Sequence, residues 1–144
     1  MDTRPEPPTS QPPLVLAMVL DAFITIESML VALLFRFEGM VPGEFWTRFW
    51  SFALVAAVVF VVLLLVGGAY RGDTLRVVII ATATSAMIAM GALVLANVGI
   101  DFVWARPVPS SVILVGGVLA LVQLVALRLL YTRVFRNRIS GRGN

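Results

Sequence analysis

The sequence predicts an all-α integral membrane protein, folded as an antiparallel four-helix transmembrane bundle. Two observations lead to this expectation. The chain of 144 residues is 60% hydrophobic and only 13% charged, which is about half the charged share of soluble domains. Its apolar residues gather in four stretches, each as long as the ~20 residues that a helix needs to cross a membrane. Short connectors join the stretches, so consecutive helices are expected to be antiparallel neighbours.

The helices follow from the apolar stretches in order. We expect spans at about residues 14–36, 49–70, 76–98 and 110–132. The last three spans are predicted from runs of uncharged residues that they largely overlap. None of the runs alternates between apolar and polar residues as the strands of a β-barrel do. The first stretch has no clear small-residue cleavage site, so we expect a retained span rather than a signal peptide.

The two ends of the chain are expected outside the membrane domain, which covers residues 14–135. Residues 1–13 are rich in Pro and polar side chains and are expected to form a disordered cytoplasmic tail. Residues 136–144 are expected to form a short basic tail, disordered beyond about Phe135.

The basic residues predict an orientation. All eleven are Arg, and placing both termini in the cytoplasm puts most of them on the inside, as the positive-inside rule requires. The inside set is Arg4, Arg71, Arg76, Arg128, Arg133, Arg136, Arg138 and Arg142; the outside set is Arg36, Arg48 and Arg106. Arg71, Arg76, Arg133, Arg136 and Arg138 are expected to set topology and to meet anionic lipid headgroups. We expect no nucleic-acid partner.

The composition excludes several kinds of chemistry. The chain has no His and no Cys, so it lacks the ligands of Cys/His metal sites, thiol nucleophiles and Ser-His-Asp triads. Its few carboxylates are isolated along the sequence. We therefore expect no enzyme activity, no cofactor and no metal.

Two carboxylates lie inside the first span, where a charge is costly and indicates a function or a specific partner. Asp21 is about 10 Å from the start of the span. The fourth span returns to the cytoplasm, so Gln123 and Arg128 are expected at the depth of Asp21, with an Asp21–Arg128 ion pair between helices. Glu27 is rotated about 240° from Asp21 around the helix. With no base at its depth, it is expected to be neutral and bonded to a Thr or Ser in Thr82–Ser85. The alternatives are that it couples a proton or cation, or that it faces lipid or an oligomer interface.

The third span contains a segment rich in small residues, Ala81–Ala92. Small residues allow close approach of helices in lipid. We expect Thr82, Ser85, Gly91 and Gly117 to serve helix packing, and the pairs Gly67–Gly68 and Gly116–Gly117 to do the same. The alternative for the hydroxyls is to line a substrate path.

Several short motifs, taken together, resemble a known family. Leu34–Pro42 resembles an L-R-F-[DE]-G-x-[IV]-P pattern with one inserted position, and Gly68–Arg71 matches G-x-Y-R. Leu75–Val78 matches L-R-x-[IV], Pro107–Val112 is a looser match to P-R-S-V, and Gly117 with Arg128–Arg133 matches a G…R-L-L…R ending. In this order they resemble the N-terminal four-span membrane domain of bacterial polysaccharide-biosynthesis (CapD-like) nucleotide-sugar epimerases and dehydratases. Similar domains precede some polyprenyl-phosphate sugar-1-phosphate transferases.

The resemblance implies a bacterial inner-membrane protein of cell-envelope polysaccharide biosynthesis. A nucleotide-binding catalytic domain follows the fourth span in that family, but these residues contain no such motif and no Lys. The expected function is therefore a non-catalytic anchor or scaffold. Its expected partners are membrane lipid, polyprenyl-phosphate carriers, a second copy of the chain or polysaccharide biosynthesis enzymes. The alternative is a small four-span proton-coupled transporter, or a lipid-linked-sugar flippase-like protein, that uses Glu27.

Overall fold

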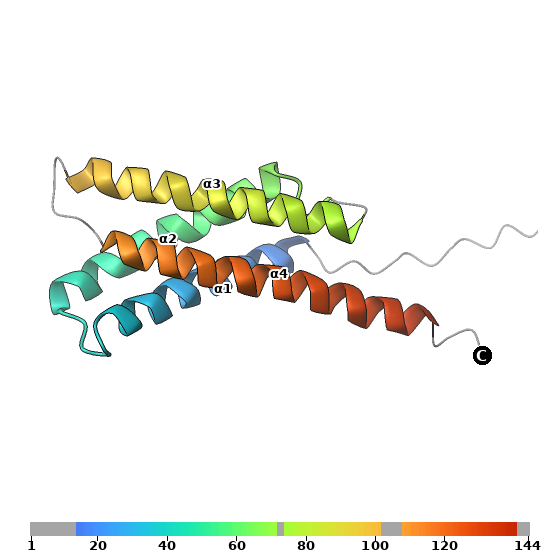
Figure 1. Cartoon of the computed structure of the whole chain (residues 1–144), viewed down its shortest axis with the longest axis horizontal. Coiled ribbons are helices and arrows are strands. Elements are labelled where there is room, and N and C mark those ends of the chain that lie inside the picture. The colour runs from blue at the N-terminus through green and yellow to red at the C-terminus, as the bar shows by residue number, and fades with distance from the viewer. Residues whose placement is uncertain (1–13, 72–73, 102–107, 141–144) are drawn as a thin grey trace, which may run out of the picture.

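The computed structural model describes residues 14–71, 74–101 and 108–140, and these residues form four α-helices and their turns. The helices are α1 (Leu14–Arg36), α2 (Gly43–Val66), α3 (Leu75–Asp101) and α4 (Ser110–Ser140). They lie side by side with alternating direction, and α4 projects beyond the others at one end (Figure 1). The predicted antiparallel four-helix bundle is confirmed.

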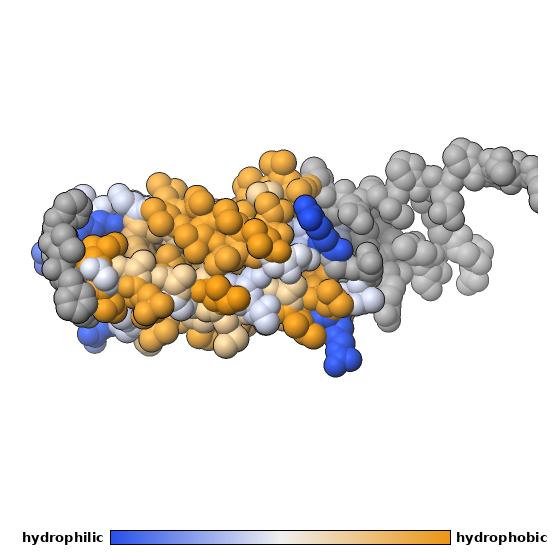
Figure 2. All heavy atoms as spheres, turned by 90° about the horizontal axis from the view of Figure 1, so that it is seen from above, coloured by the Kyte–Doolittle hydropathy of each residue, from blue (hydrophilic) through white to orange (hydrophobic). Residues whose placement is uncertain are grey.

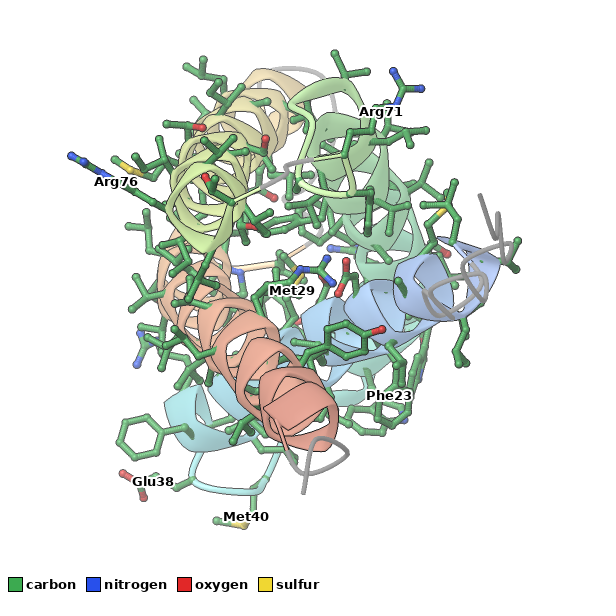
Figure 3. The ribbon with its side chains drawn as sticks, turned by 90° about the vertical axis from the view of Figure 1, so that its right-hand side faces the viewer. Phe23, Met29, Glu38, Met40, Arg71 and Arg76 are labelled. Carbon is green, nitrogen blue, oxygen red and sulfur yellow. The ribbon has the colours of Figure 1, made fainter. Side chains whose placement is uncertain are left out.

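The four helices form a closed ring. α1 packs against α2 and α4, and α3 packs against the same two helices, whereas the diagonal pairs α1–α3 and α2–α4 do not approach each other. Large apolar side chains fill the middle of the ring; those that are fully buried include Met29, Leu33, Phe60, Leu64, Ile113 and Leu124. Figure 3 shows Met29 between the helices when the bundle is viewed from one end. The interior is therefore a packed core.

The outside of the bundle is also apolar. All four helices are long and apolar enough to cross a membrane, and they expose large hydrophobic side chains such as Val58, Leu95 and Val122. On the face shown in Figure 2, hydrophobic residues form a broad band, with hydrophilic groups towards its two ends. Soluble monomers rarely expose apolar patches of this extent. The chain is a multi-pass membrane protein.

The two ends of the bundle differ in composition. One end holds the α1–α2 turn and a cluster of rings from Phe37, Phe45, Trp46, Phe49 and Trp50, with neighbouring centroids 5.2 to 6.4 Å apart; we call it the aromatic end. The opposite end holds the start of α1, the α2–α3 turn with Arg71, the start of α3 with Arg76, and the last turns of α4; we call it the arginine end. Aromatic and basic side chains at the two ends of apolar helices are typical of membrane interfaces.

Several helix boundaries differ from those expected. α3 runs over Leu75–Asp101 rather than 76–98. α2 begins at Gly43 rather than at 49, because the Pro42 carbonyl accepts the first backbone hydrogen bonds, from Phe45 and Trp46. α2 ends at Val66 rather than at 70, because Gly68 adopts a left-handed conformation (φ 79°). α4 continues to Ser140, so residues 136–140 are helical and not the disordered tail that we expected. The tails at 1–13 and 141–144 lie outside the described residues.

Glycines allow close helix contacts at two neighbouring positions of α4. A Cβ atom on Gly116 would lie 2.9 Å from Cα of Met29 in α1, and one on Gly117 would overlap the side chain of Met90 in α3. Gly67 similarly faces the Ser85 hydroxyl of α3. The expectation that Gly117 and Ser85 serve packing is confirmed. The expectation for Gly91 is wrong, because Gly91 is exposed and a Cβ there would meet nothing within 4 Å.

Because the obstacle at Gly116 is backbone, it cannot rotate away. We expect Gly116→Ala to lower the free energy of unfolding by about 1–3 kcal/mol, the usual effect of overpacking. Gly91→Ala is the matched control and should be neutral or slightly stabilising, since Ala is the better helix former. Unfolding in mixed detergent micelles, followed by circular dichroism, measures both. Equal losses in the two variants would contradict the close α1–α4 contact.

Candidate functional site

A buried polar cluster joins three parts of the bundle near the arginine end. Asp21 of α1 is fully buried. An Arg128 guanidinium nitrogen of α4 lies 2.5 Å from Asp21 Oδ2, and the Tyr70 hydroxyl donates to the same oxygen at 2.5 Å. The Arg128 guanidinium carbon also lies 5.1 Å from the centroid of the Tyr70 ring. We call Asp21, Tyr70 and Arg128 the polar lock.

Helix direction places the ion pair. α1 and α4 run in opposite directions and pack together, so a residue early in α1 meets a residue late in α4. The Asp21–Arg128 pair predicted from matched depths is therefore confirmed. Gln123 is half-buried, and among the described residues it makes no hydrogen bond to Asp21; its depth beside Asp21 stays a prediction. The Thr25 hydroxyl instead donates to the backbone carbonyl of Asp21 at 2.8 Å.

The turn after α2 brings Tyr70 into the cluster. Gly68 has a left-handed backbone conformation. The Ala69 amide donates to the Leu64 carbonyl at 3.0 Å, and the Gly68 amide donates to the Leu65 carbonyl at 3.3 Å. These two bonds define a Schellman motif, which closes a helix and reverses the chain. Ala69 and Leu64 are both buried, which is the apolar contact typical of this motif. The reversal directs the next residue, Tyr70, back against α1 and α4.

The electrostatics of the polar lock favour structure over reactivity. Arg128 neutralises the charge of Asp21, and Tyr70 adds a hydrogen bond to the same carboxylate oxygen. Burial, followed by the hydrogen bond and negative charge of Asp21, raises the pKa of Tyr70 well above its ordinary value. Tyr70 is therefore a stable donor and not a proton-transfer group near neutral pH. In the described part of the chain, Asp21 Oδ1 has no hydrogen-bond partner, and no three metal-ligating side chains come together.

Glu27 does not make the contact predicted for it. It is half-buried on α1, and α1 does not approach α3, the helix that carries Thr82 and Ser85. The Thr82 hydroxyl donates to the Val78 carbonyl of its own helix at 2.7 Å, while Ser85 packs against Gly67. The hydroxyls of α3 therefore serve helix packing, as their structural interpretation predicted, and they do not form a polar site with Glu27.

The predicted lipid-facing arginines divide into two groups. Arg71 and Arg76 are exposed, and both point away from the bundle at the arginine end (Figure 3). The other three, Arg133, Arg136 and Arg138, lie on the helical extension of α4, and their side chains are outside the described set.

Two functional side chains were not identified from the sequence. Tyr70 entered the sequence analysis only within the Gly68–Arg71 motif, and no partner was predicted for it. Asn97 is fully buried, and its amide nitrogen donates to the Val108 carbonyl at 3.1 Å and to the Ser110 hydroxyl at 3.4 Å. Asn97 thus ties the end of α3 to the start of α4. Its signal was a lone amide side chain in an uncharged run.

Fold and site together define a class: a multi-pass membrane bundle with an ion pair buried between its helices. No protein-family model, no curated protein and no solved structure matches the chain.

Breaking the buried ion pair should be strongly destabilising. Asp21→Asn or Arg128→Gln leaves the other charge buried without its partner, which costs about 3–5 kcal/mol. The double variant should lose clearly less than the sum of the two single losses, because it leaves no unpaired charge. The free energies of unfolding of the wild-type protein, the two single variants and the double variant, measured in mixed micelles, give the coupling between the two residues. Thr84→Ala, at an exposed position, is the control. Strictly additive losses would show that the two residues are not coupled.

Tyr70→Phe tests the hydrogen bond alone, since the ring that faces Arg128 is kept. We expect a loss of about 1.5–3 kcal/mol, the range for hydrogen bonds to charged groups. A raised pKa in the folded state means that this stabilisation is complete below the ordinary tyrosine pKa and is lost as the pH rises through the raised value. Tyrosinate absorbance should therefore show one late-titrating tyrosine in the wild-type protein that is missing in Tyr70→Phe.

Proposed function

We propose that the protein is a non-catalytic membrane anchor or scaffold for cell-envelope polysaccharide biosynthesis in the bacterial inner membrane, with both termini in the cytoplasm. The main observation that supports this proposal is the polar lock. It fastens α1, the α2–α3 turn and α4 to one another by charge and hydrogen bond, next to an apolar core that fills the ring. A bundle whose helices are joined by an ion pair and whose interior is packed with apolar side chains suits a rigid scaffold better than a transport channel.

The arginine end is the surface that would serve the partners. Arg71 and Arg76 point outwards there, and α4 carries the chain beyond the bundle at the same end (Figure 1). Exposed cations near a membrane surface attract phosphate headgroups by about 1 kcal/mol each. This chemistry fits a polyprenyl-phosphate carrier or an enzyme that acts on one. The family resemblance supports the same pathway.

Co-purification tests the proposal. We expect the full chain, extracted from native membranes in a mild detergent, to retain polyprenyl phosphates, glycosyltransferases or sugar-nucleotide enzymes, as identified by mass spectrometry. Arg71→Gln with Arg76→Gln should lower the bound polyprenyl phosphate by about tenfold or more, given ~1 kcal/mol per charge. Arg48→Gln, at the aromatic end, is the matched control. Recovery of bulk phospholipid alone from the wild-type protein would overturn the proposal.

Glu27 distinguishes this proposal from a proton-coupled transporter. A scaffold whose core is filled by apolar side chains has no need of a titrating carboxyl in α1. Glu27→Gln should therefore leave the recovery of partners unchanged. Loss of a proton-driven transport activity in the same variant would favour the transporter instead.

A further inference from the structure

We propose that the aromatic end carries a binding site for the headgroup of a zwitterionic phospholipid with a primary ammonium, such as phosphatidylethanolamine. A pocket of about 320 Å³ lies there between the end of α1 and the start of α4, lined by Ala32, Phe35, Arg36, Glu38, Ser111 and Val115. Its volume is at the lower end of the ~300–1,000 Å³ typical of ligand sites. The proposal does not depend on the scaffold function.

Two opposite charges line this pocket without pairing. Arg36 and Glu38 both line the pocket, and within the described ranges neither of them makes an ion pair. The two residues lie on either side of the C-terminal end of α1. The Gly39 amide donates to the Leu34 carbonyl at 2.8 Å, and Glu38 occupies the left-handed position of this second Schellman motif with φ 51°. Arg36 is thus the last residue of the helix and Glu38 lies in the turn beyond it, and both side chains are exposed.

The pocket offers one partner for each part of the headgroup. The Arg36 guanidinium would bind the phosphate, for which its planar donors are well suited. Ser111 adds a hydroxyl at the start of α4, where the helix dipole favours an anion. The Glu38 carboxylate, which points away from the bundle (Figure 3), would accept hydrogen bonds from the ammonium.

The position of the pocket suits a lipid rather than a soluble zwitterion. Arg36 is the last residue of one candidate span, and Ser110, next to Ser111, is the first residue of another; the polar groups therefore lie at the membrane boundary. Below them, the apolar side chains of Ala32 and Val115 line the same pocket, and Phe35 is 81% exposed. These surfaces would lie along the acyl chains.

Charge and donor count together predict a lipid preference. Phosphatidylcholine has a cationic headgroup but no N–H donors for Glu38, and phosphatidylglycerol lacks the cation altogether. We expect about tenfold weaker retention of either lipid than of phosphatidylethanolamine, the equivalent of one charge-assisted hydrogen bond.

The test uses the full chain, delipidated in detergent and supplied with each of the three lipids with matched acyl chains. Native mass spectrometry reports the bound fraction. Glu38→Gln should abolish the preference for phosphatidylethanolamine over phosphatidylcholine, while Arg36→Gln should weaken retention of all three lipids. Soluble phosphoethanolamine should compete poorly, because it lacks the acyl chains.

Glu44→Gln and Arg48→Gln are the matched controls, since both residues are exposed at the same end and neither lines the pocket. These controls should bind as the wild-type protein does. Equal retention of the three lipids by the wild-type protein would overturn the proposal. So would equal effects of the pocket and control variants, because the aromatic end would then attract headgroups only through its overall charge. Competition by soluble phosphoethanolamine at equal concentration would reassign the pocket to a free zwitterion.

Discussion

The burial of Asp21 is the constraint on which the bundle depends. A carboxylate in a lipid-spanning helix costs several kcal/mol unless it is paired, and here Arg128 and Tyr70 supply the charge and the hydrogen bond. These partners come from α4 and from the turn after α2, so satisfying one side chain fixes the positions of three elements. The close contact of Gly116 with Met29 allows α1 and α4, the two helices that carry the ion pair, to pack closely.

The two ends of the bundle combine polar groups in different ways. Near the arginine end, opposite charges from different helices meet inside the protein and neutralise each other. At the aromatic end, Arg36 and Glu38 are close in sequence, yet they remain unpaired beside a pocket. Interior pairing contributes to stability and gives a rigid body. In the two proposals above, exposed charges at the membrane boundary would serve recognition instead.

The sequence predicted the parts that depend on composition and on helix geometry. The four helices follow from apolar length, and the Asp21–Arg128 pair follows from antiparallel spans of known rise. The features that were not predicted depend on local backbone conformation and on which helices are adjacent in the bundle. Tyr70 joins the lock only because Gly68 reverses the chain. Glu27 misses Thr82 because α1 and α3 are diagonal and not adjacent, a distinction that the order of the spans does not contain.

The separation of Asp21 from its partners along the chain has a consequence for biogenesis. α1 is synthesised before α4 and enters the membrane with a carboxylate that still lacks its counter-charge, which is costly in a lipid-spanning helix. The counter-charge of Arg128 arrives only with α4, 107 positions later. The ion pair that joins α1 to α4 can therefore form only after α4 has been synthesised, and a polypeptide interrupted before α4 would keep Asp21 without its counter-charge.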